Sequence, residues 1–530
     1  MRRPHVTQRS VRAAPRVFLI GFALAVLCGI FLRAYHVERK VFWEDEALGA
    51  MHMLGYTEAE IVRVSPSLPN AAALQSYLVL PPNDSFGATV RSLALEDPQH
   101  PPLYYVLTHA WVRIFGPSVA SLRWLSVLFG ILVLPCAFWL ARELFEAREV
   151  ALTFTALVAV SPLYVLYAQE AREYSLWTVT TLLLCIAFLR ARRTRSIIDW
   201  VLYAAAFALG LYVYPLTGLV ALGMGLYVLF VERGRRNKTL GAFLVSTLAG
   251  TVAFAPWLTT MLTSPGLRRG MAVITSGKLS AVGTVFLFLR NVRSAIFDFG
   301  AFRLGPLGST VPNALLVALA VLLAGYALCF LVRNAPVHQW GFVLFALCVP
   351  FTLLVVKDLT GHGLFVYQAR YFIPLFIGLE LALAFTFAHK ALRPGSGWQW
   401  RAALAAVLLG GAASCLVSSQ ARTWWNKGYE RSPDVAAIVN RAGRPLVVSD
   451  YFTPSILDLS RYLRPDVALR LNLKCAQCTL PARERAPSEG APGDVFVLGI
   501  PPDSSARSGR WIDPRPFPRQ ADPLNMFAAL

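Results

Sequence analysis

The chain has 530 residues, of which 56% are hydrophobic and only 15% are charged, and its formal net charge is +20. Soluble domains carry about 25% charged residues, so this composition excludes an ordinary soluble enzyme. The arginines gather in short runs between apolar stretches, and no nucleic-acid-binding motif accompanies them. Such runs are typical of the cytoplasmic loops of membrane proteins, so a nucleic-acid partner is not expected.

About eleven apolar segments are predicted to cross the membrane, because a helix needs about 20 apolar residues to span the hydrocarbon core. The first of them follows a basic N-terminus but lacks a clear cleavage site, which favours an uncleaved anchor over a signal peptide. The predicted spans are residues 17–35, 119–141, 150–168, 174–190, 199–215, 216–232, 240–262, 311–332, 340–357, 371–389 and 402–420.

The arginine runs give the predicted orientation. If residues 1–16 are cytoplasmic, then the basic runs at 190–195 and 233–238 also fall in the cytoplasm, as the positive-inside rule requires. Residues 101–115 decide this count, because treating them as a span would place both runs outside. This segment is shorter than a span, so we expect an amphipathic helix that lies in the outer interface.

Three pieces of the chain then face outward, namely the loops 36–118 and 263–310 and the C-terminal region 421–530. In the last of these, Leu446–Asp450 and Val495–Leu498 alternate as strands do. The expected fold class is therefore an all-α polytopic membrane protein, with a transmembrane domain over residues 17–420 and a small extracytoplasmic α/β domain over residues 421–530. The tail also carries Cys475 and Cys478, which could form a disulfide, half a zinc site or two free thiols.

Carboxylates are scarce in this chain, and three of them follow the first predicted span as Trp43-Glu44-Asp45-Glu46. Adjacent acids repel one another unless they are paired, so this turn is either a solvated acidic loop or the general base for an acceptor hydroxyl or amine. Asp97 and His100 lie before Pro101 in the same loop, where proline fixes an extended backbone. They are candidate binding residues or an ordinary proline-capped helix start.

Two arginines on the predicted outer side are candidate phosphate ligands. Arg172 and Tyr174 lie in the short turn between the third and fourth spans, and Arg370 and Tyr371 open the tenth span. Arginine matches phosphate geometry well, and an outer arginine runs against the positive-inside rule. The alternatives are a snorkelling loop with an internal ion pair and ordinary interfacial anchors. No metal ligand is assigned, although a divalent metal held by Asp45, Asp97 and His100 is left open.

Taken in order, these motifs resemble the protein O-mannosyltransferase and aminoarabinose transferase group of the GT-C glycosyltransferases, over about residues 15–390. The resemblance implies a helical membrane fold, a polyprenyl-phosphate sugar donor and inversion at the anomeric centre. It also implies that Asp45 is the catalytic base with Glu46 in support, that His100 helps to shape the cleft, and that Arg172 and Arg370 neutralise the lipid phosphate. The motifs are Trp43–Glu46, His100–Tyr105, Arg123 with Gly130, Ser161-Pro162, Gln169–Tyr174, Pro256-Trp257 and Arg370-Tyr371.

Two departures leave the acceptor and the sugar open. The region after residue 420 matches no domain associated with characterised members, and the turn Gln169–Arg172 differs from the leucine-aspartate ending of the mannosyltransferases. The arginine- and alanine-rich composition favours a bacterium of high genomic GC content, so the expected carrier is undecaprenyl or decaprenyl phosphate in the inner membrane, with the site facing the periplasm. The alternatives are a flippase, although the internal repeat expected of a transporter is not evident, and a catalytically inactive scaffold.

Overall fold

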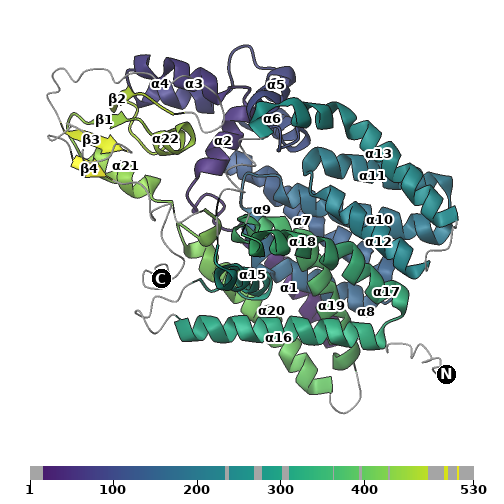
Figure 1. The fold of residues 1–530 in the computed structure, drawn as a ribbon. Helices are drawn as coiled ribbons and strands as arrows, with labels where there is room; N and C mark the ends of the chain where they lie inside the picture. The colour runs from purple at the N-terminus through teal and green to yellow at the C-terminus, as the bar shows by residue number, and fades with distance from the viewer. Residues whose placement is uncertain are drawn as a thin grey trace, which may run out of the picture.

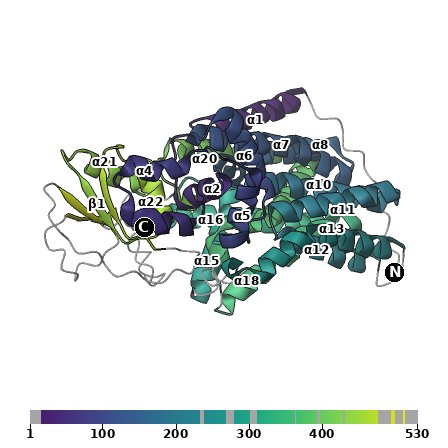
Figure 2. The same ribbon diagram turned by 90° about the horizontal axis from the view of Figure 1, so that it is seen from above.

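The structure is a computed structural model that describes residues 16–232, 238–267, 277, 279–300, 310–361, 363–392, 397–427, 430–474, 494–498 and 510–512. Most of the described chain is a bundle of long apolar helices, with a small β-sheet unit beyond one end of the bundle (Figures 1 and 2). Cys475 and Cys478 lie outside the described residues, so their state stays a prediction.

All of the segments predicted to span the membrane are helical where the structure describes them. Seven helices among the described residues are long and apolar enough to cross a membrane, or up to eight if the bent pair α8–α9 forms one span. The remaining predicted spans are the shorter apolar helices α1, α11 and α12, so the count of eleven stays a prediction. The bundle consists of α1 (Arg16–Ala34), α7 (Val119–Phe145), α8 (Arg148–Val160), α9 (Pro162–Ala168), α10 (Tyr174–Thr194), α11 (Ile197–Val213), α12 (Thr217–Val231), α13 (Lys238–Thr263), α16 (Thr310–Asn334), α17 (Val337–Gly341), the π-helical η3 (Phe342–Cys348), α18 (Val349–Leu359), α19 (Ile373–Ala391) and α20 (Gly397–Gln420).

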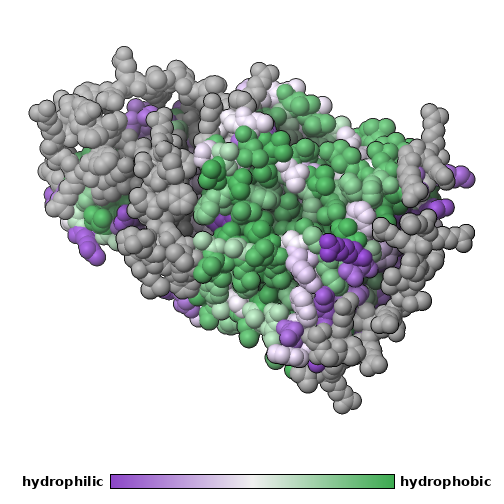
Figure 3. Space-filling model, turned by 60° about the horizontal axis from the view of Figure 1, so that its bottom comes forward, coloured by the Kyte–Doolittle hydropathy of each residue, from purple (hydrophilic) through white to green (hydrophobic). Residues whose placement is uncertain are grey.

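The outside of the bundle is apolar, as a bilayer requires. Ile20, Leu24, Leu27 and Phe31 are all exposed on α1, and their three- and four-residue spacing places them on one face. Figure 3 shows a broad hydrophobic surface over the helices, with hydrophilic residues gathered toward one end. An apolar surface of this extent is unusual for a soluble monomer and is expected of a protein that faces lipid.

A proline break inside the bundle is closed by an arginine. α8 and α9 meet at an angle of 57° because Pro162 has no N–H to continue the helix, and carbonyls of the last α8 turn lose their partners. Arg33 of α1 donates to two of them, to the oxygen of Ala159 at 2.6 Å and to that of Val158 at 3.0 Å. Gly29 makes this approach possible, since a Cβ there would overlap Ala159. The bend directs α9 so that it ends at the turn containing Arg172.

Short helices cover one end of the bundle. The helix predicted to lie in the interface is present as α6, and its 13 residues are too few to cross a bilayer. It ends at Gly116, whose φ of 78° lies in the left-handed region that favours glycine. The elements outside the bundle are α2 (Glu44–Met53), α3 (Glu58–Val64), η1 (Ser65–Ser67), α4 (Ala71–Gln75), η2 (Ser76–Leu78), α5 (Phe86–Glu96), α6 (Leu103–Phe115), α15 (Ala281–Ile296), η4 (Phe365–Tyr367), η5 (Ala369–Phe372) and η6 (Trp425–Lys427).

The C-terminal region forms a parallel sheet in the order β2-β1-β3-β4, with the two predicted strands present as β1 and β3. Leu446 of β1 pairs with Ala468 of β2 on one side and with Val495 of β3 on the other. The first outer loop joins this sheet, because Asn70 forms an antiparallel bridge to Ala468. The elements are α21 (Ser432–Asn440), β1 (Leu446–Ser449), α22 (Thr453–Ser460), β2 (Ala468–Leu471), β3 (Val495–Leu498) and β4 (Arg510–Ile512).

Candidate active site

The candidate residues lie at one end of the bundle, and the arginine run at residues 190–195 lies at the other. α10 shows this most simply, since it begins at Tyr174 beside the site and carries Arg190, Arg192 and Arg193 near its far end. A helix rises 1.5 Å per residue, so the two ends of α10 are about 30 Å apart. α19 repeats the arrangement, beginning just after Arg370 and ending at its basic last turn.

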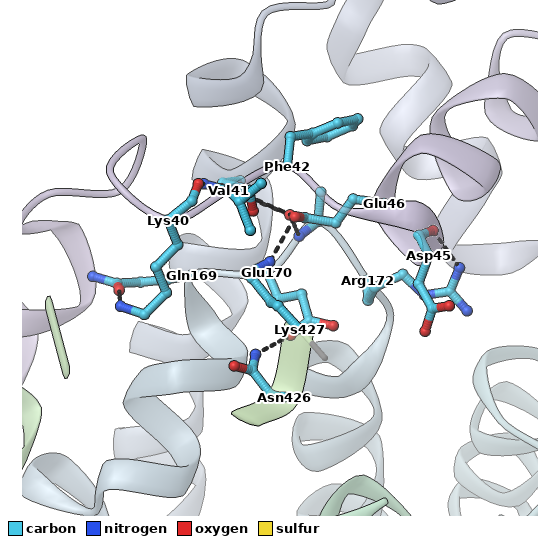
Figure 4. Close-up of polar contacts among 12 residues, drawn as sticks. Lys40, Val41, Phe42, Asp45, Glu46, Gln169, Glu170, Arg172, Asn426 and Lys427 are labelled. Carbon is cyan, nitrogen blue, oxygen red and sulfur yellow. Dashed lines mark hydrogen bonds and ion pairs between the residues drawn. The ribbon is translucent and has the colours of Figure 1, made fainter. Parts of the chain in front are cut away.

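Three consecutive carboxylates open α2, where the helix dipole favours negative charge. Each of them points to a different partner. Glu44 accepts a hydrogen bond from Ser455 of α22, Asp45 pairs with Arg370, and Glu46 turns into the bundle (Figure 4). The predicted repulsion within this turn is therefore relieved by separate partners.

Glu46 is fully buried and both of its oxygens are occupied. Arg123 of α7 donates to them from Nε at 2.8 Å and from Nη2 at 2.7 Å, Lys427 Nζ lies 2.6 Å away, and the N–H of Ala171 donates at 2.9 Å. Burial alone would raise the pKa of Glu46, but Arg123 and then Lys427 hold it at about 2. Glu46 is thus a permanently charged anchor between the first outer loop and the turn after α9, without a free oxygen for a substrate.

Asp45 is the open member of the acidic turn. Its Oδ2 lies 2.9 Å from Arg370 Nη1, while its side chain is 29% exposed. Arg172 Nη1 donates to the backbone oxygen of Asp45 at 3.0 Å, which brings both candidate phosphate ligands to one residue. Partial burial raises the pKa of Asp45, but Arg370 and then Arg172 lower it below its ordinary value. The carboxylate is therefore ionised at neutral pH and accessible.

Arg172 links Asp45 to His100. Arg172 Nη2 lies 3.2 Å from His100 Nε2, and His100 Nδ1 lies 2.8 Å from Glu173 Oε1. Glu173 also faces Arg172 Nε at 3.4 Å, and although burial raises its pKa, Arg172 and then His100 keep it at about 2. Asp97 is the last member of this group, since its Oδ1 lies 3.9 Å from His100 Nε2.

Tyrosine rings form one wall of the site. The Arg370 guanidinium lies 5.1 Å from the ring centre of Tyr174 and 5.7 Å from that of Tyr371, within the range of cation–π attraction. Tyr214 completes the wall, 6.2 Å from Tyr174 and 6.5 Å from Tyr371. Tyr371 is partly exposed, whereas Tyr174 is completely buried and Tyr214 nearly so, and the three rings pack around the Arg370 guanidinium.

The structure brings the predicted site residues other than Glu46 into one group of connected contacts, and Glu46 is joined to that group only as the chain neighbour of Asp45. Among the described residues, no cluster of three or more His, Cys, Asp or Glu side chains is arranged to hold a metal ion, and a metal requirement stays a prediction. The connected residues are Asp45, Asp97, His100, Arg172, Tyr174, Arg370 and Tyr371.

Sequence reasoning did not identify four further members of the site. Glu173 holds His100, Lys40 Nζ donates to Gln169 at 3.2 Å, and Asn426 and Lys427 reach in from beyond the last bundle helix (Figure 4). The signal that singled out Arg370 applied to both lysines as well, because each is a cation on the side where the positive-inside rule predicts few.

Comparisons with known proteins agree with this geometry. Residues 99–259 match the family described as dolichyl-phosphate-mannose-protein mannosyltransferase. ArnT from Cupriavidus metallidurans bound to undecaprenyl phosphate superimposes with a TM-score of 0.52 at 13% identity, covering 86% of each chain. The apo state of that protein gives the same TM-score at 12% identity, covering 86% of this chain and 85% of that one. A search of curated protein sequences finds no match.

These findings confirm the resemblance to the protein O-mannosyltransferase and aminoarabinose transferase group and a GT-C fold. The family match begins one residue before His100 and ends just beyond Trp257, so it includes Arg172 but neither Asp45 nor Arg370. The contacts of those two residues come from the structure of this chain itself.

Proposed function

We propose that this chain is a membrane glycosyltransferase that moves a sugar from a polyprenyl-phosphate carrier to an acceptor on the non-cytoplasmic face, with inversion. The observation that carries the proposal is the Asp45 carboxylate, ionised and partly open, held between Arg370 and Arg172. A base next to two phosphate-binding cations is the minimum that such a transfer needs.

The arginines would act on the leaving group. Arg370 is only 11% exposed and Arg172 is almost completely buried, so their interactions with a phosphate are weakly screened by water. As the bond between the anomeric carbon and the phosphate oxygen breaks, negative charge collects on the lipid phosphate. The two guanidinium groups lie where they can stabilise this charge.

Asp45 would receive the proton of the acceptor. The acceptor hydroxyl or amine forms a bond to the anomeric carbon from the face opposite the phosphate, its proton moves to Asp45, and the polyprenyl phosphate departs. When a phosphate draws Arg370 away, Asp45 loses the cation that lowers its pKa most. Donor binding would therefore make Asp45 a stronger base.

The placement of the site supports the proposed side and carrier. The site lies at the end of the bundle opposite the arginine run at residues 190–195, so the positive-inside rule favours the periplasmic face of a bacterial inner membrane. Undecaprenyl or decaprenyl phosphate is the proposed carrier, in keeping with the undecaprenyl phosphate bound to ArnT. The tyrosine wall is proposed to hold the sugar, whose identity is left open with that of the acceptor.

The test is release of free polyprenyl phosphate from a panel of lipid-linked sugars by the purified protein. Asp45→Asn keeps the size of the side chain and removes the base, so the rate is expected to fall by about 10²–10⁴-fold. Asp466→Asn is the matched control, since Asp466 is 69% exposed and pairs with Arg464 on the surface. If Asp45→Asn releases the product as fast as the wild type, the assigned base is wrong. If neither the wild type nor Asp45→Asn consumes any donor, a transporter or scaffold function is favoured over a transferase.

A further inference from the structure

Residues Trp424–Lys427, which we name the strap, follow the last bundle helix α20. They contact the acidic turn, which consists of Glu44, Asp45 and Glu46, through Lys427. Each of its four side chains donates to a carboxylate that belongs to another part of the chain. Trp424 and Trp425 donate to Asp298 Oδ2 at 2.9 and 2.6 Å, Asn426 donates to Glu170 Oε2 at 2.6 Å, and Lys427 donates to Glu46 Oε2 at 2.6 Å.

The three acceptors come from three separate outer segments. Asp298 follows α15, Glu170 lies in the turn between α9 and α10, and Glu46 lies in the first turn of α2. The backbone adds a further tie, since the N–H of Val41 donates to the oxygen of Arg422 at 2.8 Å. The strap therefore joins three separate segments beside the site.

Lys427 is more than Glu46 needs for charge balance. Arg123 already gives Glu46 two hydrogen bonds, and one cation neutralises one carboxylate. The Lys427 side chain is 1% exposed, and removing an ammonium group from water carries a penalty that a neutral residue would avoid. Lys427 also interacts electrostatically with Glu170, but the hydrogen bond that it donates goes to Glu46, so its contact with the acidic turn is a defined geometry as well as a charge.

We propose that Lys427 is a positioning residue, which holds Glu46 so that the neighbouring Asp45 faces Arg370 and the substrates. This inference rests on the proposed function of Asp45. Successive residues of a helix are separated by about 100° of rotation, so a rotation of the first turn of α2 that moves Glu46 also moves Asp45. The C-terminal region also contacts the first residue of the acidic turn, because the Ser455 hydroxyl donates to the Glu44 carboxylate.

Lys427→Met tests this inference, because methionine keeps much of the side-chain length and removes the charge. Lys474→Met is the matched control, since Lys474 is 59% exposed and pairs with Asp450 at 3.1 Å in the C-terminal sheet unit. The catalytic rate of Lys427→Met is expected to fall roughly ten- to hundredfold with little change in the KM for the donor, as for a misplaced catalytic group. The acidic limb of its pH profile should move upward, since an Asp45 that no longer faces Arg370 loses the interaction that lowers its pKa most.

Hydrogen exchange of the amides in α2 gives a readout that does not depend on activity. We expect faster exchange of residues 44–50 in Lys427→Met and no change in Lys474→Met, with α10 protected equally in all forms. Lys427→Arg, which keeps the charge, should recover part of the rate and of the protection.

Three results would overturn the inference. The first is a rate for Lys427→Met equal to that of Lys474→Met. The second is a loss of rate with unchanged exchange in α2, which would place Lys427 in contact with substrate. The third is faster exchange throughout the bundle without any movement of the acidic limb, which would leave only a role in folding. A wild type that releases no polyprenyl phosphate would refute the proposed function instead, and exchange in α2 would still decide whether Lys427 anchors that helix.

Discussion

The regions around Glu46 and Asp45 hold the same kind of charge in opposite ways. Glu46 is completely buried, and four donor atoms from three other parts of the chain occupy its oxygens. Asp45, the preceding residue, has one oxygen paired with Arg370 and a side chain that is 29% exposed. One carboxylate therefore holds the protein together, whereas the other is available to react.

The difference shows that proximity of charged groups does not by itself identify chemistry. A buried ion pair with every partner satisfied is costly to break and has no capacity for a ligand. A charged group with an open side and a cation that a substrate can displace has that capacity. The contrast can be tested by removing each charge in turn.

The largest expected difference is in stability. Glu46→Ala leaves Arg123 and Lys427 buried without their shared partner, so the free energy of unfolding should fall by about 3–5 kcal/mol. Asp45→Ala removes a partly exposed ion pair and should cost within about 1 kcal/mol. Thermal unfolding of the detergent-solubilised proteins measures both, and equal losses for the two variants would contradict the distinction between them.

The next effect concerns binding of the carrier. Arg370→Met removes the cation that faces Asp45, and a charged hydrogen bond is worth about 1.5–3 kcal/mol, so affinity for free undecaprenyl phosphate should fall roughly ten- to hundredfold. Arg464→Met is the control, because Arg464 pairs with Asp466 on the surface of the C-terminal unit. Equilibrium binding of the lipid by both variants makes the comparison, and an unchanged affinity for Arg370→Met would remove this residue from the phosphate site.

A smaller effect is expected in the dependence of stability on pH. The pKa of Glu46 is about 2 in the folded protein, against about 4.3 for an unperturbed glutamate. A lowered folded-state pKa stabilises the fold above the unfolded value, and this contribution is lost as the pH falls through the folded one. Unfolding temperatures from pH 7 to pH 3 should therefore decline more steeply for the wild type than for Glu46→Gln. Parallel curves would show that Glu46 is not held as the contacts imply.

The smallest effect is expected at the other anchor of the acidic turn. Ser455→Ala removes one hydrogen bond to Glu44, which is worth about 1 kcal/mol or less, and the rate of transfer should change less than about threefold. Because Glu44 and Glu46 flank Asp45, combining Ser455→Ala with Lys427→Met should cost more than the sum of the two changes. Strict additivity would show that the two anchors act independently.

Local sequence patterns predicted the helices well, but they could not predict which distant residues contact one another. Apolar length placed α7, α10 and α20, and the shortness of the apolar segment 101–115 indicated α6, because these signals lie within the segment concerned. The role of Lys427 was not predictable in this way, since the residue meets Glu46 across 381 positions of sequence.

The split between Glu46 and Asp45 was equally hidden from sequence. Both are acids in one turn, and their difference arises from Arg123, which donates to Glu46 and also to three backbone oxygens of the first loop. The resemblance to known enzymes indicated which residues are candidates for the site. Their contact partners could be identified only from the structure of this chain.

The arginine that closes the break between α8 and α9 also has a consequence for the order in which the protein is made. Arg33 is synthesised 126 positions before Ala159, the carbonyl partner that it meets in the bundle. Until that partner emerges, the first helix carries a charge whose insertion into lipid costs about 2.5–3.5 kcal/mol at the centre of a span. Because Arg33 lies in the last turn of α1, its charge can remain at the membrane surface until α8 has been synthesised. We therefore expect α1 to shift inward only when α8 and α9 arrive, a late movement during biogenesis that the finished bundle conceals.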